Sequence, residues 1–306
     1  MAIFTLPNDG ELFTQQILDR CEDLIASEIW AGITHIRLDT WMKNFSTPTE
    51  RYFAATILDA LIYRSEKQTF SLMEALFQRA LPDLLRQHPP SKPAPESWID
   101  CLRAPVTSAN QPIRLVPVIK TNDSPAKSGP ALCRLYRRHL GLEQNWMIWP
   151  WQIAAFRAAG ITQFLFIDDF LGTGEQFCEF ADHFTLSTHL HDCYAVYGPL
   201  VAHRDGITAI RKHSPAFHIS AVEIIDQSYS LFADDSRWFQ DSTNTPSMAL
   251  AFYDNLVTRA SLPIRPDALR GFGNLSLTYA FNHATPDNCL PLLWCESANW
   301  KPLLDR

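Results

Sequence analysis

Two adjacent carboxylates, Asp168 and Asp169, directly follow a run of four apolar residues at 164–167. Such a run is typical of a strand buried on both faces of a parallel sheet, and the acids stand where we expect that strand to end. Ligands of open α/β sheets bind just beyond the carboxyl ends of the strands. An acidic pair at this position could therefore bind the hydroxyls of a sugar or a metal ion.

A turn of small residues, Gly172, Thr173 and Gly174, comes next and leads into residues that can open a helix. The N-terminus of a helix presents unpaired N–H groups and a positive dipole end, which suit a phosphate. Two other interpretations exist. The acids could simply cap a turn after a buried strand. A P-loop nucleotidase would need a Gly-x-x-x-x-Gly-Lys-Ser/Thr loop, and the absence of any Gly-Lys pair argues against it.

The stretch FLFIDDFLGTGEQ, residues 164–176, resembles the phosphoribosyl pyrophosphate (PRPP) motif of type I phosphoribosyltransferases. The resemblance implies that Asp168 and Asp169 are the catalytic acids that face the ribose hydroxyls. It assigns the 5′-phosphate to the turn formed by Phe170, Leu171, Gly172, Thr173, Gly174, Glu175 and Gln176. It also implies Mg²⁺ that arrives with the ligand, with Asp168 or Asp169 as the protein group that would contact it. Glu175 and Gln176 depart from the family pattern, which usually has a small or neutral residue followed by Thr or Ser.

Composition indicates a cytoplasmic protein. The chain of 306 residues is long enough for one large domain or two. It has no apolar run of about 18 residues and no N-terminal signal peptide, so we expect no membrane span. The seven cysteines are scattered without a C-x-x-C pair, which favours reduced thiols and argues against a zinc site. A formal charge of −7 argues against broad nucleic-acid binding, although a local patch could still bind one.

The spacing of apolar residues predicts helices over most of residues 10–88. Thr47-Pro48-Thr49-Glu50 forms a capping box with proline at the first helical position. The proline-rich stretch at 88–98 then ends the helical region. We therefore expect an all-α N-terminal domain and linker at 1–105, followed by an α/β domain at 106–306. The resemblance implies a Rossmann-like parallel sheet of the type I phosphoribosyltransferase kind for the second domain, and we expect a helical insertion at about 227–270.

A polar loop follows the predicted strand at 113–120 and precedes a helix. In type I phosphoribosyltransferases a loop after an early strand binds pyrophosphate. The residues suited to that role are Lys120, Lys127, Ser128 and Gly129, because they offer cations, a hydroxyl and a flexible backbone at a helix start. An ordinary polar surface loop is the alternative. The helix that follows carries a basic cluster, Arg134, Arg137, Arg138 and His139, which is either a solvated face or a contact for an acidic partner or a nucleic acid.

Polar side chains crowd a short loop near the end of the sequence. Asn282, His283 and Asn288 could supply the acceptor side of the site, or could simply form a turn. Only about 30 residues separate the pyrophosphate loop from the acidic strand, so the chain lacks room for the flexible loop that closes over PRPP in type I enzymes. That difference argues against ordinary transferase activity.

Three segments, at 41–65, 167–177 and 279–294, together resemble the phosphoribosyltransferase-like proteins of bacterial conflict and anti-phage systems, including retrons. The resemblance implies a defence effector that binds PRPP or another ribose-5-phosphate-bearing nucleotide and transfers or cleaves at ribose C1. Its partners would be that ligand and a defence-system protein or nucleic acid, with no membrane. The alternative is a non-catalytic module that senses a nucleotide or binds a partner.

Overall fold

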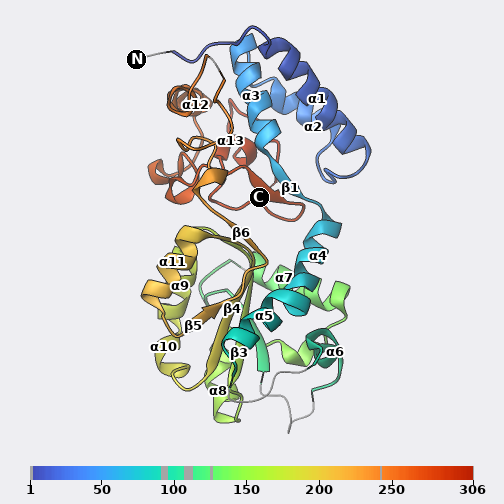
Figure 1. Ribbon diagram of the computed structural model, residues 1–306, viewed down its shortest axis with the longest axis vertical. Helices are drawn as coiled ribbons and strands as arrows, with labels where there is room; N and C mark the ends of the chain where they lie inside the picture. The colour runs from blue at the N-terminus through green and yellow to red at the C-terminus, as the bar shows by residue number, and fades with distance from the viewer. Residues whose placement is uncertain (1–2, 91–95, 107–112, 125–126, 242, 306) are drawn as a thin grey trace. The chain divides into compact units, whose positions relative to one another are not determined.

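The computed structural model describes residues 3–90, 96–106, 113–124, 127–241 and 243–305 (Figure 1). Contacts divide the chain into two compact units. The first combines Met1–Thr69 with Asp226–Arg306, and the second is the continuous stretch Phe70–Ile225. This division differs from the boundary predicted at 105/106, because the N-terminal helices pack with the C-terminal segment and not as a domain of their own.

The unit Phe70–Ile225 is built on a parallel sheet. Its strands are β2 (Ile113–Pro117), β3 (Gln163–Leu171), β4 (Tyr194–His203), β5 (Phe217–Ile219) and β6 (Glu223–Ile225). The order is β2-β3-β4-β5, and β6 pairs with a later part of β4. Both β5 and β6 are short and pair with different parts of β4. The prediction of a parallel sheet is confirmed.

Helices cover both faces of this sheet (Figure 1). On one face lie α8 (Ile153–Ala158), α9 (Glu175–His183), α10 (Leu186–His189) and α11 (Arg204–His213). On the other lie α5 (Leu81–Gln87) and α7 (Ser128–Leu140), with α4 (Glu66–Ala75), the π-helical turn Leu76–Ala80 and α6 (Trp98–Arg103) nearby. The core on the α9 face is aromatic, with Phe166 of β3 in edge contact with Phe177 and Phe180. This core fixes α9 against the strand that carries the acidic pair.

The other unit contains α1 (Gly10–Ala26), α2 (His35–Met42), α3 (Pro48–Ala60), α12 (Pro246–Ala260) and α13 (Pro291–Trp294). It also contains a two-stranded parallel sheet of β1 (Ile62–Arg64) and β7 (Tyr279–Phe281). Residues 1–105 are thus not all-α, because β1 interrupts the predicted helical region and pairs with a distant strand. Of the predicted helical insertion, α12 is the one long helix among the described residues.

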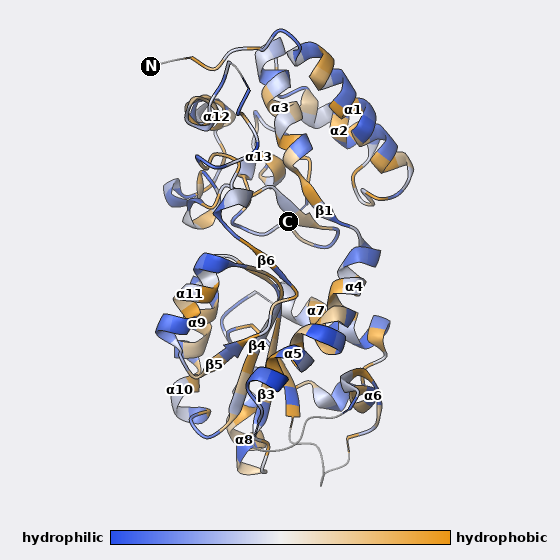
Figure 2. Ribbon diagram, viewed as in Figure 1, coloured by the Kyte–Doolittle hydropathy of each residue, from blue (hydrophilic) through white to orange (hydrophobic). Residues whose placement is uncertain are grey.

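The core of this unit is formed by large aromatic side chains, among them Trp41, Phe53, Tyr253 and Trp300, each less than 2 % exposed. Helix α1 is amphipathic, and Figure 2 shows hydrophilic and hydrophobic residues alternating along it. No helix in the described part of the chain is long and apolar enough to cross a membrane. All seven cysteines lie in the described part of the chain, and none of them forms a disulfide.

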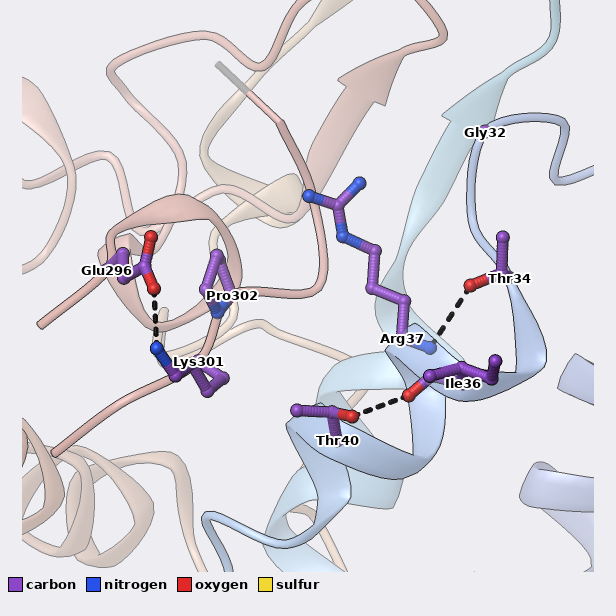
Figure 3. Close-up of a pocket in the computed structure, with 8 residues that line it drawn as sticks. All are labelled: Gly32, Thr34, Ile36, Arg37, Thr40, Glu296, Lys301 and Pro302. Carbon is purple, nitrogen blue, oxygen red and sulfur yellow. Dashed lines mark hydrogen bonds and ion pairs between the residues drawn. The ribbon is translucent and has the colours of Figure 1, made fainter. Parts of the chain in front are cut away.

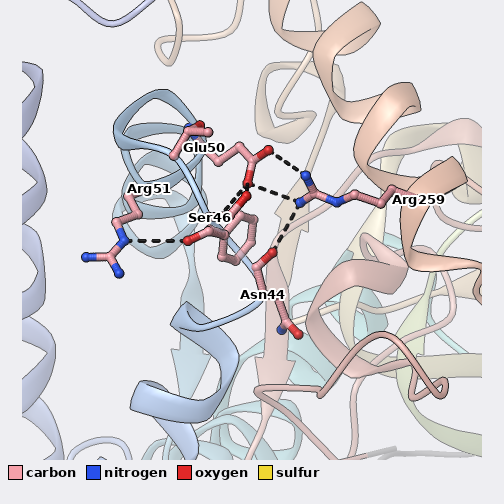
Figure 4. Close-up of polar contacts among 7 residues, drawn as sticks. Asn44, Ser46, Glu50, Arg51 and Arg259 are labelled. Atoms are coloured by element: carbon pink, nitrogen blue, oxygen red, sulfur yellow. Dashed lines mark hydrogen bonds and ion pairs between the residues drawn. The ribbon is translucent and has the colours of Figure 1, made fainter.

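The predicted capping box starts α3 (Figure 4). Oγ1 of Thr47 accepts a hydrogen bond from the N–H of Glu50 at 3.2 Å. The Glu50 carboxylate returns to the N–H of Ser46 at 2.6 Å, one residue earlier than in the usual box. Arg259 of α12 then donates to Glu50 at 2.5 Å and to the carbonyl of Asn44 at 3.1 Å. One carboxylate therefore caps α3 and joins it to α12.

Candidate functional site

The acidic pair lies inside β3 and not beyond its end. Strand pairing continues past the acids, since Phe170 and Leu171 pair with Val201 and Ala202 of β4. The expectation that the strand ends at the acidic pair is therefore wrong, because β3 continues to Leu171. The long neighbouring strand β4 supplies backbone partners that extend β3 up to the glycine turn.

The two carboxyl groups are neighbours on β3, and their side chains interact with each other. Oδ2 of Asp168 accepts a hydrogen bond from the hydroxyl of Tyr197 at 2.9 Å, and Oδ1 accepts from the N–H of Asp169 at 3.0 Å. The Tyr197 ring stacks on Phe177 of α9, which places Asp168 on the α9 face. Burial raises the pKa of Tyr136 on α7, and the charges of Cys133 and Asp169 add to the rise, so Asp169 lies near α7.

Both acids are nearly inaccessible to solvent: Asp168 is 2 % exposed and Asp169 is 7 % exposed. Burial raises the pKa of Asp168 well above its usual value, and the neighbouring charge of Asp169 adds to the rise. The hydrogen bond from Tyr197 opposes it, because a donor favours the ionised carboxylate. Paired carboxyl groups with a raised pKa are a common feature of functional sites, although buried structural pairs show it too.

The glycine turn after β3 is fixed by close backbone packing. Gly174 has φ +87° and is the N-cap of α9. A Cβ atom on Gly206 in the first turn of α11 would lie 2.3 Å from the carbonyl oxygen of Gly172, and one on Gly174 would lie 2.9 Å from the carbonyl oxygen of Gly206. Within the turn, the N–H of Glu175 donates to Oγ1 of Thr173 at 3.4 Å. Glycine is therefore needed on both sides of this contact.

The turn places the N-terminus of α9 at the carboxyl edge of the sheet, a few residues after the acidic pair in the sequence. Glu175 and Gln176, the two residues that depart from the phosphoribosyltransferase pattern, are exposed there. The N–H groups of the first helical turn have no partner within the helix and suit a phosphate.

The loop after β2 lies along α9. Nζ of Lys120 is 2.6 Å from Oε2 of Glu179, and Oγ1 of Thr121 is 2.8 Å from Nε2 of His183. The ion pair raises the pKa of Lys120. Since β2 and β3 are parallel neighbours, this loop leaves the sheet at the same edge as the glycine turn.

The rest of the predicted pyrophosphate loop returns to the end of β2. Nζ of Lys127 lies 3.6 Å from Oδ1 of Asp123, and the N–H of Lys120 donates to Oδ2 of the same residue at 2.8 Å. A Cβ atom on Gly129 would lie 3.0 Å from the carbonyl oxygen of Val118, so α7 starts close to the strand. Ser128 is the first residue of α7. The structure thus brings all four predicted residues to one edge, with both lysines beside carboxylates.

The predicted acceptor residues belong to the other unit. Asn288 is 7 % exposed, and its Nδ2 donates to the carbonyl of Phe272 at 2.8 Å, so it holds two loop segments together. The N–H of Asn282 donates to the carbonyl of Arg64 at 2.9 Å and prolongs the pairing of β7 with β1. His283 is half-buried near Phe281. Their role on the acceptor side stays a prediction.

A shallow pocket of about 440 Å³ also lies in that unit (Figure 3). Its lining residues include two cations, and each is paired with a carboxylate. Arg37 donates to Asp305 at 2.7 Å, and Nζ of Lys301 lies 2.7 Å from Oε1 of Glu296. The acidic pair and the glycine turn do not line this pocket.

Three residues that contact the site were not predicted from the sequence: Tyr197, Glu179 and Gly206. Tyr197 reads as one more apolar residue of a buried strand, and Glu179 as a charge on a helix surface. Of the three, only Gly206 has a signal in the sequence, because a glycine just inside a helix is unfavourable unless another backbone approaches closely.

A family comparison identifies a phosphoribosyltransferase-like protein. A family model described as PRTase-CE matches residues 38–306, and the chain belongs to this family. Among solved structures, the chain is similar to the AQ2163 protein from Aquifex aeolicus, with 12 % identity and a TM-score of 0.32. The match covers 57 % of this chain and 84 % of that one, and it is too weak to define a fold. A comparison with curated proteins gave no match.

Proposed function

We propose that the protein binds PRPP or another ribose-5-phosphate-bearing nucleotide and transfers or cleaves at ribose C1. Membership of a phosphoribosyltransferase-like family supports this. The observation that carries it is the glycine turn, in which Gly174 at positive φ starts α9 at the carboxyl edge of a parallel sheet, directly after the acidic pair. Close packing against Gly206 keeps the turn in this shape without a ligand.

The roles follow from the chemistry of the reaction. Cleavage at ribose C1 passes through an oxocarbenium-like state, which needs positioning and charge stabilisation more than a nucleophile. In the proposal Asp168 and Asp169 bind the ribose hydroxyls, and the turn from Phe170 to Gln176 binds the 5′-phosphate. Lys120 and Lys127 neutralise the leaving pyrophosphate after exchanging their present carboxylate partners for it.

Mg²⁺ belongs to the proposal as an ion that arrives with the ligand. The described residues contain no group of three or more His, Cys, Asp or Glu that could hold a metal ion alone. Mg²⁺ usually binds one or two carboxylates together with phosphate oxygens and water. Asp168 and Asp169 carry the oxygen donors that it prefers, and its chemistry would be to neutralise the pyrophosphate charge.

Isothermal titration tests the binding. We expect heat from PRPP and from ribose 5-phosphate in the presence of Mg²⁺, weaker binding of NAD or ATP, and a loss of affinity for the first two ligands in Gly206→Ala, which disturbs the turn. Gly160→Ala controls for general destabilisation, because it strains the backbone at φ +90° before β3 begins and adds no contact within 4 Å. Binding of none of the four ligands by the wild-type protein would refute the proposal.

A non-catalytic module that senses a nucleotide or binds a partner is the second candidate. Three observations favour it: the acids are buried, both lysines lie beside carboxylates, and residues 127–162 contain helices and turns but no β-hairpin. A closing loop normally protects the reaction from water. Phosphorus NMR distinguishes the two candidates, since an enzyme converts PRPP over time whereas a sensor binds it unchanged.

A role as an anti-phage defence effector is supported by the resemblance of the three segments named above. Its macromolecular partner would be a defence-system protein or a nucleic acid. Arg134, Arg137 and Arg138 are exposed on α7 at helical spacing and form the surface most suited to an acidic partner. Replacing all three by Gln should reduce capture of that partner and leave PRPP binding unchanged.

A further inference from the structure

Tyr197 of β4 contacts both elements that the proposed function assigns to the ligand. Its hydroxyl donates to Oδ2 of Asp168 at 2.9 Å. Its ring stacks on Phe177 with 4.0 Å between centroids and 25° between planes. Phe177 lies in the first turn of α9, next to the proposed phosphate site. Tyr197 is 1 % exposed, so these contacts exclude water.

We infer that Tyr197 is a positioning residue for the ribose-phosphate site, which holds Asp168 on the α9 face through its hydroxyl and fixes the first turn of α9 through its ring. The identity of the ligand in this inference rests on the proposed function, whereas the contact between Tyr197 and Asp168 does not. One side chain would then set the distance between the sugar-binding acids and the phosphate-binding turn.

The hydrogen bond matters because Asp168 is buried. Its two oxygens accept from the Tyr197 hydroxyl and from the N–H of Asp169. A buried carboxyl group that loses a donor either rotates towards another partner or takes up a proton. Either response changes the hydrogen-bonding groups that the acidic pair would offer to a sugar hydroxyl. The ring acts separately, since a phenylalanine at 197 would keep the stacking on Phe177 and remove only the donor.

Tyr197→Phe therefore separates the two contacts. With Mg²⁺ present, we expect it to weaken ribose 5-phosphate at least fivefold and to change the affinity for inorganic phosphate less than twofold. Tyr194→Phe is the matched control, because Tyr194 lies on the same strand and its hydroxyl donates to the carbonyl of His88 at 2.7 Å. It should bind both ligands like the wild type. Equal losses for both ligands in Tyr197→Phe, or no loss, would overturn the inference.

The reciprocal variant is Phe177→Leu, which removes the stacking and keeps the hydroxyl. We expect it to weaken inorganic phosphate and ribose 5-phosphate by the same factor, at least threefold, because both need the first turn of α9. Unchanged phosphate affinity in this variant would contradict the role given to the ring. Circular dichroism and melting curves establish that each variant is folded.

Infrared spectroscopy examines the contact without a ligand. The difference spectrum between wild type and Asp168→Asn identifies the carboxyl band of Asp168. In Tyr197→Phe this band should persist to higher pH, because the lost donor favoured the ionised form, and Tyr194→Phe should leave it in place. An unmoved band would overturn the inference even if ribose 5-phosphate binds. If the wild type binds none of PRPP, ribose 5-phosphate, NAD and ATP, the proposed function fails and, with it, the assignment of Tyr197 to a ligand site.

Discussion

Nζ of Lys120 lies 2.6 Å from Oε2 of Glu179, so the loop that should take pyrophosphate is held to α9 by an ion pair. The two side chains are 20 % and 54 % exposed. A pyrophosphate that binds Lys120 must displace this carboxylate, and the cost of doing so reduces the affinity for the ligand.

Glu179→Gln should therefore tighten PRPP binding. A surface ion pair contributes roughly 0.2–1 kcal/mol, so the gain should be no more than about fivefold, with ribose 5-phosphate unchanged. Calorimetry measures both affinities. Asp182→Asn on the same helix is the control, because Asp182 pairs with His213 at 2.9 Å and not with the loop. Weaker PRPP binding in Glu179→Gln would mean that the pair holds the loop in its binding shape.

Lys127→Ala should have the opposite effect. A lost charged contact costs about 1.5–3 kcal/mol, so PRPP should bind roughly ten- to a hundredfold more weakly, while ribose 5-phosphate should bind as before. Lys212→Ala removes an exposed lysine at the end of α11 and serves as the control. Equal losses for the two ligands in Lys127→Ala would remove this loop from the pyrophosphate assignment.

The strand before the acids and the helix after the glycine turn could be predicted because both depend on local patterns. The length of β3 could not, because it is set by pairing with β4, as the pair Leu171 and Ala202 shows. The three-residue strand β1 has no local pattern and exists only because a distant segment pairs with it. For the same reason the partners of predicted site residues, Tyr197 and Glu179, could not be recognised.

Asp168→Asn should change how stability depends on pH. The pKa of Asp168 is raised in the folded state, so the folded protein holds this proton more tightly than the unfolded chain. Its contribution to stability is complete below the unfolded value of about 3.9 and is lost as pH rises through the folded pKa. The Asn variant lacks this loss, so its stability relative to wild type should increase with pH in urea unfolding between pH 4 and about 8.

Asp192→Asn is the matched control of opposite sign. The hydrogen bond from Arg157 lowers the pKa of Asp192 to about 2, so its contribution is lost only as pH falls below the unfolded value. The difference in the free energy of unfolding between this variant and wild type should stay constant over the same pH range. A constant difference for Asp168→Asn as well would show that Asp168 is not protonated in the folded protein.

Glu175→Gln examines the residue that departs most from the phosphoribosyltransferase pattern. A carboxylate about 6 Å from a phosphate would repel each unit of charge by about 3 kcal/mol at an effective dielectric of about 20. Glu175 is exposed, and water and salt screen such a charge. We therefore expect the affinity for PRPP to change less than twofold, as for Asp182→Asn. A tenfold gain would show that Glu175 faces the ligand and selects against phosphate charge.

The unit that combines Met1–Thr69 with Asp226–Arg306 is made of two separate parts of the chain, and this affects its folding during synthesis on the ribosome. The strand β1 leaves the ribosome early, but its partner β7 follows only after the whole stretch Phe70–Ile225 has been made. The parallel sheet of that stretch can form as soon as β6 has emerged, whereas α1, α2 and α3 must wait with exposed apolar faces for the end of the chain. Nascent chains stalled once residue 225 has left the ribosome should therefore protect the β2–β6 segment from protease while the N-terminal helices remain open to chaperones.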